Sequence, residues 1–388
     1  MVRPPTSLST PASVSVQLIE TRDALERIAP QWNILLNWSE ADCIFLTWEW
    51  IASWINSVFP EVRPFVIAVY IENHLVGIAP FYLSSCRLLN TINYTCLRAL
   101  GDCHSGAEYP DIILKKGCEK IALSAIASCF IENREKWDCA YIPNVAGWTG
   151  AIERLAEAFS LKLSFFRKRP ASFSCMTLPE TFDEFQLKTI DRKVRQNIRR
   201  HEKRLSPTHD INWEFCTSEI DLPEYLDDLF QLHGKRWESL GQTGSFVRRP
   251  LMKKFYQSFS PTALRNGWLK LSRLKVDGKP LALQYGYQYK TTFLTLQGGF
   301  DPTGPSGSGI ILRNKVLHWC IENGLRTYDF LGEHTPQKQR WGAQERFGCH
   351  LFLGNAKLKN IPLARLGFWP SGRFIKEGFP ANQGTSHD

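Results

Sequence analysis

Hydrophobic and polar residues follow the same order twice along the chain. In the first half, the apolar runs 63–71 and 78–83 flank a polar turn, and they predict a β-hairpin. In the second half, residues 268–276 and 280–289 predict another hairpin of the same kind. A helical segment containing tryptophan precedes each hairpin, and a strand, a helix and a further strand follow it. This repetition predicts two diverged copies of one α/β unit.

The second copy contains a glycine-rich loop between a strand and a helix. Residues 293–300 predict a buried strand, residues 301–309 are rich in glycine and proline, and residues 310–323 carry the broad apolar face of a helix. Gly324 is placed to end that helix, and residues 327–331 predict a short strand. Such a loop is either an ordinary turn or an anion cradle, because a helix N-terminus presents free N–H groups and a positive dipole. The loop lacks the Walker A pattern, which leaves a backbone cradle such as that for the pyrophosphate of coenzyme A.

A strongly basic helix is expected at the start of the second copy. The two copies should join near Pro179, and residues 182–205 then predict an amphipathic helix with an apolar stripe through Ile198 and basic residues on its other faces. One interpretation is an electrostatic surface for nucleic acid or a phosphorylated substrate. The other, which we favour, is a helix packed on the protein body with a solvated basic face.

Composition narrows the class of protein and its partners. A chain of 388 residues is long enough for two domains, and 43% hydrophobic with 22% charged residues is typical of a folded protein. The formal net charge of +9 favours anionic partners. The 11 cysteines include no CxxC pair, so neither a disulfide framework nor a metal site is expected. The polar, proline-rich residues 1–13 are expected to be disordered and are not a secretion signal, and no apolar run is long enough to span a membrane. These features predict a cytoplasmic protein and leave peripheral membrane contact open.

Three motifs carry a resemblance to a known family. Residues 193–205 (KVRQNIRRHEKRL), 232–246 (LHGKRWESLGQTGSF) and 328–342 (YDFLGEHTPQKQRWG) resemble motifs of acetyltransferase-like proteins linked to bacterial cellulose and exopolysaccharide biosynthesis, the CelD-like family. The resemblance extends from about residue 16 to residue 353. It implies an α/β fold of two tandem GNAT units with mixed central sheets. It also implies acyl transfer from an acyl-coenzyme A, such as acetyl-coenzyme A, to a small-molecule or glycan acceptor.

The resemblance also suggests how the chain is divided. We expect a disordered tail at residues 1–13 and an N-terminal GNAT-like domain at residues 14–180, which would supply scaffold and acceptor wall. A C-terminal GNAT domain at residues 181–354 would bind the donor and carry catalysis, followed by an extension at residues 355–388.

A second resemblance gives an alternative function. Lys338 with Trp341 and Gly342 is similar to the Lys-x-x-aromatic-Gly pattern of Fem-type peptidyl transferases, double GNAT proteins that use aminoacyl-tRNA. Gln337 departs from that pattern, because those enzymes usually have an aromatic residue there. Nucleic acid is therefore disfavoured as a partner, with tRNA as the alternative donor. A non-catalytic regulatory GNAT protein is the third interpretation.

The donor site is expected at the end of the predicted strand 293–300 and in the glycine-rich loop after it. In GNAT folds a backbone N–H on this strand commonly stabilises the developing oxyanion of the thioester. Backbone N–H groups of the loop would surround the pyrophosphate, helped by one arginine of the following helix. The residues implied for donor binding are Gln297, Gly298, Gly299, Gly304, Gly307, Ser308, Gly309 and Arg313.

Four residues form the candidate catalytic set: Asp329, Glu333, His334 and Lys338. A carboxylate or an imidazole near neutral pKa suits the base that removes the acceptor's proton. Asp329 is either such a carboxylate or a structural hydrogen-bond anchor, because an acid inside an apolar strand needs a partner. His334 is otherwise an ordinary surface histidine. Lys338 and Arg340 would position an anionic acceptor or are solvated loop charges.

Both copies are expected to contribute to the acceptor site. Trp237 either shapes a sugar-binding groove or anchors its helix to the sheet. The loop 101–111 of the first copy lacks a compact glycine cradle, and its side chains, including His104 and Glu108, could reach an acceptor across the interface. No nucleophile pattern suggests a covalent acyl-enzyme, so direct transfer is expected. The predicted acceptor residues are Arg236, Trp237, Tyr109, Asp111, Arg340 and Trp341.

Overall fold

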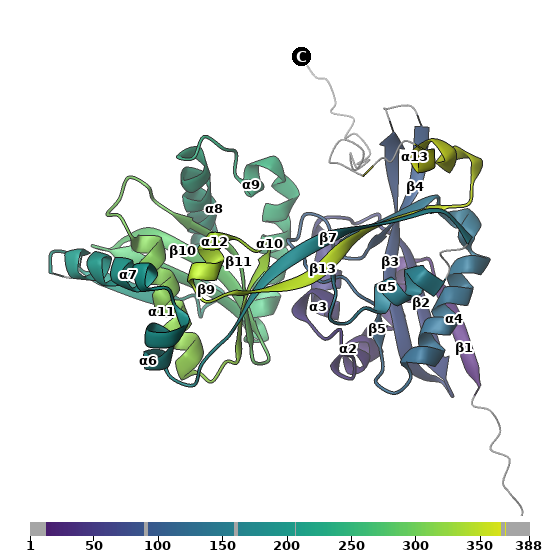
Figure 1. Cartoon of the computed structure of the whole chain (residues 1–388), viewed down its shortest axis with the longest axis horizontal. Helices are drawn as coiled ribbons and strands as arrows, with labels where there is room; N and C mark the ends of the chain where they lie inside the picture. The colour runs from purple at the N-terminus through teal and green to yellow at the C-terminus, as the bar shows by residue number, and fades with distance from the viewer. Residues whose placement is uncertain (1–12, 89–91, 159–161, 206, 366–368, 370–388) are drawn as a thin grey trace, which may run out of the picture.

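The chain forms an α/β structure around one large mixed sheet (Figure 1). The computed structural model describes residues 13–88, 92–158, 162–205, 207–365 and Trp369. The predicted disordered tail therefore lies, apart from Ser13, outside the described residues, and so does most of the C-terminal extension. The strands of the sheet have the order β1-β2-β3-β4-β6-β13-β7-β12-β11-β10-β9-β8, and β5 pairs with β3.

The strands of the first half confirm the predicted hairpin. Its two arms are β2 and β3, which pair in antiparallel fashion from Arg63 opposite Leu83 to Ile71 opposite His74. A short parallel pairing of β4 with β6 follows. The strands are β1 (Val14–Ile19), β2 (Arg63–Ile71), β3 (His74–Leu88), β4 (Ile92–Ala99), β5 (Ile113–Leu114), β6 (Cys139–Ala146) and β7 (Leu163–Thr177).

The second half repeats this arrangement. Its hairpin is β9 with β10, and β11 then pairs with β12 in parallel. The two parallel pairings occupy equivalent places in the two halves, as expected for two copies of one unit. The strands are β8 (Ile211–Phe215), β9 (Leu269–Val276), β10 (Lys279–Tyr289), β11 (Thr292–Phe300), β12 (Thr327–Gly332) and β13 (Gln344–Asn355).

Strands β7 and β13 join the two halves, which the sequence did not predict. Strand β13, from the end of the second half, pairs with β6 of the first half. Strand β7, from the end of the first half, pairs with β12 of the second half, and β7 and β13 also pair with each other. Figure 1 shows these two long strands crossing between the halves. The halves are thus linked through one continuous sheet.

Helices cover the sheet on both sides and close a core shared by the halves. Trp50 of α3 (Trp48–Ser57) packs against α10 (Pro250–Arg265), with ring centroids 4.7 Å from Phe255 and 4.9 Å from Phe259. The Trp50 ring centroid also lies 5.9 Å from that of Tyr287 of β10. None of the helices among the described residues is long and apolar enough to cross a membrane. The helices of the first half are α1 (Arg22–Arg27), α2 (Ala29–Asn37), η1 (Ile44–Leu46), α3 (Trp48–Ser57), α4 (Glu119–Glu132), η2 (Arg134–Lys136) and α5 (Ala151–Ala158).

The helices of the second half include the predicted basic helix and the helix after the glycine-rich loop. They are α6 (Phe182–Glu184), the π-helical turn η4 (Phe185–Thr189), α7 (Arg192–Leu205), α8 (Leu222–Glu238), α9 (Ser245–Arg248), α10 (Pro250–Arg265), α11 (Ser308–Glu322) and α12 (Pro336–Arg340). The extension adds η5 (Leu358–Asn360) and α13 (Ile361–Arg365).

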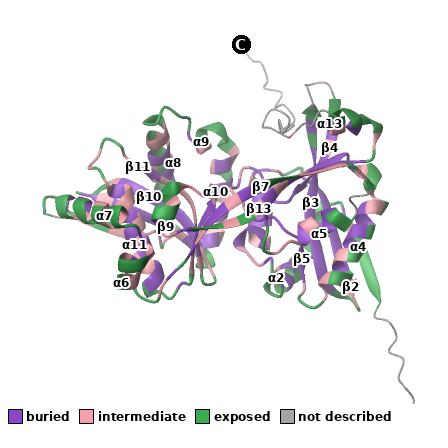
Figure 2. Ribbon diagram, viewed as in Figure 1, coloured by how far each residue is buried: buried purple, intermediate pink, exposed green. Residues whose placement is uncertain are grey.

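The predicted single helix over residues 182–205 is wrong in its continuity. The π-helical turn η4 ends at Thr189, and α7 begins only at Arg192. The amphipathic pattern itself is confirmed, since Ile198 and Leu205 are buried. Most basic side chains of α7 are exposed, and the helix lies at the outer end of the second half (Figure 2).

Candidate active site

The candidate site begins where β11 and β12 separate. The two strands pair in parallel over only three positions, from Thr292 opposite Thr327 to Leu294 opposite Asp329. Beyond Leu294, the edge of β11 that faces β12 has no paired strand among the described residues. The strands therefore open a wedge, and Asp329 lies at its closed end.

Asp329 is buried in this wedge and bonded to the first half of the chain. Its carboxylate accepts hydrogen bonds of 3.0 Å from the Tyr109 hydroxyl to both oxygens, and one of 2.8 Å from the Leu331 N–H. Burial raises the pKa of Asp329 to about 6, opposed by these hydrogen bonds and by the charges of Arg346 and Lys338. The same surroundings raise the pKa of Tyr109, through burial and then the charge of Asp329. Two predicted site residues, Tyr109 of the first half and Asp329 of the second half, are thus in contact where the two halves meet.

Glu108, next to Tyr109, is the second buried acid of the site. Burial and then the charge of Asp329 raise the pKa of Glu108 to about 8, while Lys338 and the Gly332 backbone oppose the rise. The Glu108 Oε2 atom is buried without a hydrogen-bond partner. A Cβ placed on Gly332 would lie 2.9 Å from Glu108 Oε1, so only glycine leaves the carboxyl this space. Near neutral pH, the two acids together hold about one proton.

Lys338 supplies a positive charge beside the two acids. Its ammonium donates to the carbonyl oxygens of Leu331, Gly332 and Glu333, the last at 2.9 Å. Burial lowers the pKa of Lys338, and the charges of Glu108 and Asp329 oppose that change. The lysine is therefore both a clamp on the turn after β12 and the counter-charge of the acid pair.

The backbone around these groups adopts conformations that are uncommon outside glycine. Leu331 has a φ of 59°, Glu333 of 55°, Tyr109 of 60° and Asn144 of 58°. The Tyr109 N–H donates to the Asn144 carbonyl at 3.1 Å. Left-handed conformations at such residues are costly and cluster at functional sites. Their grouping here shows that the backbone is constrained where the two halves meet.

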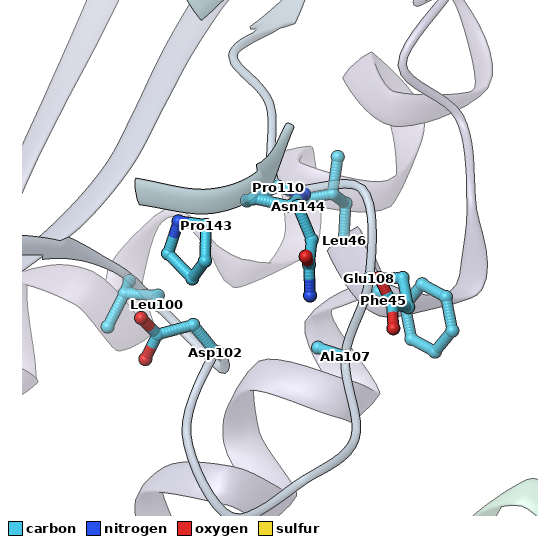
Figure 3. A pocket seen from close by; sticks show the side chains of 9 residues that line it. All are labelled: Phe45, Leu46, Leu100, Asp102, Ala107, Glu108, Pro110, Pro143 and Asn144. Carbon is cyan, nitrogen blue, oxygen red and sulfur yellow. The ribbon is translucent and has the colours of Figure 1, made fainter. Parts of the chain in front are cut away.

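A small cavity lies beside Glu108 on the side of the first half. Its volume is about 40 Å³, enough for water or a small substituent rather than a whole substrate. Figure 3 shows Glu108 and Phe45 on one side of it and Leu100 and Asp102 on the other. The lining residues are Phe45, Leu46, Leu100, Asp102, Ala107, Glu108, Pro110, Pro143 and Asn144.

Glu333 and His334 lie at the rim of the wedge. The Glu333 side chain is exposed. The His334 Nδ1 atom is 2.9 Å from the Ser174 hydroxyl, and the backbone N–H of His334 donates to the Ser172 hydroxyl at 3.1 Å. Both residues are close in sequence to Lys338, and the charge of Glu333 adds to the rise in the pKa of Glu108.

The remaining predicted acceptor residues are dispersed. Asp111 is buried away from the wedge, where its carboxylate accepts from the N–H of Ile112 at 2.8 Å and of Ile152 at 3.2 Å near the start of α5. Burial raises the pKa of Asp111 to about 6. Arg340 is exposed, whereas Trp341 is buried in the core of the second half.

Helix α8 packs directly on the end of β11. A Cβ on Gly299 would lie 2.3 Å from the His233 backbone nitrogen, so glycine is required for this close approach. Arg236 donates to the Gly298 carbonyl at 3.3 Å, and the Trp237 indole donates to His233 Nε2 at 3.0 Å. Gln297, Gly298 and Gly299 therefore lie near the end of β11, beyond its pairing with β12, and Arg236 lies beside them.

The glycine-rich loop leads into α11 as predicted, but another helix covers part of it. Gly307 caps α11 with a φ of 102°. A Cβ on Gly307 would lie 2.2 Å from the His201 imidazole of α7. Gly304 packs near Leu281, Gly309 packs near Phe300, and Ser308 is buried.

The residues at this end of α11 suit a phosphate-bearing donor. The first N–H groups of a helix have no acceptor within the helix, and they point outward at the N-terminus. One turn further along, the Arg313 Nε atom is buried without a hydrogen-bond partner. These donor groups fit the pyrophosphate of a coenzyme A. In the described part of the chain, no cluster of three or more His, Cys, Asp or Glu side chains is arranged to hold a metal ion.

The wedge between parallel strands, the loop and the helix after it define an acyltransferase domain of the GNAT class. Residues 192–339 match the family model described as acetyltransferase (GNAT) domain. This match covers the strands and helices that build the wedge, so the chain contains a GNAT acetyltransferase domain. No protein with curated annotation matches the sequence.

Solved structures extend the similarity to most of the chain. The crystal structure of FemX has a TM-score of 0.59 at 13% identity, covering 87% of this chain and 98% of FemX. The C-terminal domain of a putative lysylphosphatidylglycerol synthetase from Agrobacterium fabrum has a TM-score of 0.51 at 12% identity, covering 88% and 95%. At these identities the similarity establishes the fold. The fold is the predicted one, with two GNAT units in tandem.

Sequence reasoning undervalues Glu108. It groups this residue with the acceptor wall, because the loop that carries Glu108 lacks any catalytic motif. The partners Asp329 and Lys338 lie more than 200 positions away in the sequence, so only the fold brings them together. The one available signal is the loop itself, an irregular segment containing acids where the other copy has its glycine-rich loop.

Proposed function

We propose that the protein transfers an acyl group from an acyl-coenzyme A directly to an amine or hydroxyl acceptor. The observation that carries this proposal is the buried acid pair Glu108 and Asp329, with Lys338, at the opening between β11 and β12. Acyl transfer requires that the acceptor lose a proton as it attacks the thioester, and this pair can take it. The acceptor identity follows only from the CelD-like resemblance, which points to polysaccharide or cell-envelope synthesis.

The geometry favours Glu108 as the base. Its Oε2 atom has no hydrogen-bond partner and the residue lines the cavity, so the ionised carboxylate is free to accept a proton. Both Asp329 oxygens already accept hydrogen bonds from Tyr109, which suits an orienting and charge-balancing role. Lys338 stabilises the ionised form of the pair through its charge. The predicted catalytic role of Asp329 is thereby refined to support of Glu108.

The donor would lie along the free edge of β11. A bound acyl-coenzyme A would supply the activated thioester, while the strand end at Gln297, Gly298 and Gly299 would face its carbonyl oxygen. Backbone N–H groups in this position stabilise an oxyanion without reorganisation. The second half would thus bind the donor, and the first half would add Glu108 and Tyr109 as part of the acceptor wall.

Calorimetric titration with acetyl-coenzyme A and a longer acyl-coenzyme A tests the donor class. Saturable binding that persists at moderate salt supports the proposal and identifies the donor for an acceptor screen. If neither compound binds, the proposed donor is wrong. If binding occurs but no sugar, amine or glycolipid acceptor is acylated, the regulatory interpretation is favoured.

A second candidate function is Fem-like transfer from aminoacyl-tRNA. It is supported by Lys338, which lies in the wedge with Trp341 and Gly342 in the Fem-type spacing, and by the exposed basic face of α7. Binding of charged tRNA should then weaken steeply with salt, because phosphate contacts release counterions. Tight, salt-sensitive tRNA binding without binding of acyl-coenzyme A would replace the first proposal with this one.

A further inference from the structure

Two arginines face the wedge without any acidic partner. Arg236 comes from α8 and Arg313 from the second turn of α11, so they approach the opening from different helices. Within the described residues, neither guanidinium forms an ion pair with a carboxylate. Elsewhere in the fold, a buried arginine is paired with acidic side chains. Arg273, for example, pairs with Glu214, Glu224 and Asp228.

Arg236 is held at the end of β11. It donates one hydrogen bond to the Gly298 carbonyl at 3.3 Å. Its guanidinium carbon lies 5.5 Å from the ring centre of Trp237 and 5.7 Å from that of Phe300. Burial, and then the charge of Arg313, lower the pKa of Arg236. An arginine stays ionised in proteins despite such a shift, so the charge of Arg236 lies in a place where its own surroundings do not compensate it.

Arg313 lies near both Arg236 and Lys338. Its guanidinium carbon is 5.4 Å from the ring centre of Trp341 and 5.8 Å from that of Phe330, and its Nε atom is buried without a hydrogen-bond partner. Its charge acts on both Arg236 and Lys338. A half-buried guanidinium with an unused donor is costly unless something outside the chain pairs with it.

We propose that Arg236 and Arg313 form a side-chain site for a phosphate ester group of the acyl donor inside the wedge, in addition to the backbone N–H groups at the start of α11. This inference rests on the proposed function, because it takes the ligand to be the donor. The His201 imidazole packed against Gly307 removes part of the loop from use as a backbone cradle. The guanidinium pair would supply anion contacts that this part of the loop cannot.

A phosphate ester fits this pair better than a carboxylate does. A carboxylate carries one charge, whereas three cationic side chains converge here if Lys338 is included. The ring faces of Trp237, Phe300, Phe330 and Trp341 flank the two guanidinium groups. Of these rings, those of Trp237 and Phe300 are only partly buried, and they suit a ligand that carries a flat base or an apolar arm next to its phosphate. Coenzyme A and the 3′ end of an aminoacyl-tRNA share this chemistry.

The test compares Arg313→Gln with the matched variant Lys315→Gln. Lys315 is two positions further along α11 and lines a different groove with Phe182 and Asp183. Calorimetry would measure the binding of three ligands: coenzyme A, pantetheine and a short RNA ending in CCA. Pantetheine is the part of coenzyme A that lacks the phosphates. We expect Arg313→Gln to lower the affinity for the phosphorylated ligand by about 10- to 100-fold, which is the usual effect of removing one charged hydrogen-bonding group. Lys315→Gln should bind like the parent protein.

The ligand that responds identifies the source of the phosphate. Loss of coenzyme A affinity assigns the site to that donor, and loss of RNA affinity with no coenzyme A binding assigns it to a tRNA end. Both results support the site, and the second contradicts only the proposed acyl-coenzyme A donor. The inference is wrong if Arg313→Gln binds every phosphorylated ligand as tightly as the parent protein does. It is also wrong if the variant loses as much affinity for pantetheine as for the phosphorylated ligands.

A stability measurement separates binding from folding. Because Arg313 has no ion pair to lose, Arg313→Gln should melt no lower than the parent protein in the absence of ligand. The stabilisation by coenzyme A should shrink in this variant and persist in Lys315→Gln. A large drop in the melting temperature without ligand would make Arg313 a structural residue and overturn the proposal.

Discussion

At the residue scale, the main feature of the candidate site is the carboxyl group of Glu108, which holds its proton near neutral pH. Glu108 is kept protonated by burial and by Asp329, which is itself bonded to Tyr109. The sequence singles out Asp329 as a candidate catalytic residue, but it does not show that Glu108 and Tyr109 lie against it. Their combination, from two distant segments, creates a base whose strength is matched to the pH at which it would work.

Replacing Glu108 with Gln should remove the base while preserving the shape of the site. We expect the transfer rate to fall by about 10²- to 10⁴-fold with the donor affinity nearly unchanged. The parent rate should rise with pH and level off above about 8, because the base acts in its ionised form. Steady-state kinetics from pH 6 to 9 measures both effects.

The matched control for this variant is Glu132→Gln, an exposed acid on α4 of the same half. It should keep the parent rate and the parent pH profile. A Glu108→Gln protein that retains the normal rise in rate with pH would show that another group is the base.

Glu108 should also affect stability in a pH-dependent way. Its pKa in the folded state, about 8, is above the ordinary value of 4.5, so the folded state binds more protons between these values. Stability must then fall as the pH rises from about 4.5 to 8. Glu108→Gln should therefore stabilise the protein at pH 8 by roughly 1–4 kcal/mol, because a raised pKa costs the ionised form about 1.4 kcal/mol for each tenfold change in its proton affinity. The variant should have little effect near pH 4.5.

Urea denaturation of the parent and of Glu108→Gln at pH 4.5 and at pH 8 tests this expectation. The difference in the free energy of unfolding between the two proteins should appear only at the higher pH. Equal effects at both pH values would contradict the buried, protonated state of Glu108.

At the element scale, the contact of α8 with β11 fixes one wall of the wedge. The strand end has three residues in a row where donor contacts are expected, and the helix backbone touches the last of them. The helix thereby limits how far β11 can move away from β12. The close approach depends on one missing side chain, that of Gly299.

Gly299→Ala should be destabilising by about 1–3 kcal/mol, because the new methyl group would overlap the α8 backbone. Gly309→Ala is the comparison. Its Cβ would meet Phe300 at an ordinary 3.5 Å, and alanine favours a helix, so its stability should be unchanged or slightly higher. Thermal melting of both variants tests this difference; equal melting temperatures would mean that α8 shifts freely on the sheet.

The elements that sequence reasoning predicted are those with a strong local pattern. The hairpin arms β2, β9 and β10 and the helix α11 are apolar runs bounded by turns, so local sequence suffices. Strands β7 and β13 were missed because their sequences mix basic, aromatic and small residues without clear alternation. Their stability as strands comes from pairing with segments far away in the chain. Local propensity carries no information about such partners.

The candidate site divides in the same way. The donor side, from Gln297 through the loop to Arg313, is one continuous segment, and its loop and helix could be predicted from the sequence. The acid pair requires a contact between residues 108 and 329, which no periodicity encodes. His201 against Gly307 is likewise a contact between helices, and it changes how much of the loop can face a ligand.

At the scale of the whole molecule, the two halves share both a sheet and a core. Strands β7 and β13 each pair with the other half, and Trp50 packs among residues of α10. Residues 14–180 expressed alone would lack the β13 partner of β6 and would expose the ring of Trp50. We therefore expect this fragment not to fold alone, although the predicted division places a domain there.

Circular dichroism and urea unfolding of the fragment and of the full chain test this expectation. The full chain should unfold in one cooperative transition, and the fragment should show no cooperative transition unless residues 181–388 are added. A fragment that unfolds cooperatively by itself would establish residues 14–180 as an independent domain. That result would also mean that the shared strands contribute little to either half.

The pairing of β6 with β13 has a consequence for the newly made chain. Strand β6 ends at Ala146 and its neighbour begins at Gln344, about 200 residues later. At ribosomal speeds of about 5–20 residues per second, the edge of β6 waits roughly 10–40 s for its partner. An unpaired strand edge invites pairing with other chains during that time. We therefore expect the first half to need protection, for example by a chaperone, until the last strand has been synthesised.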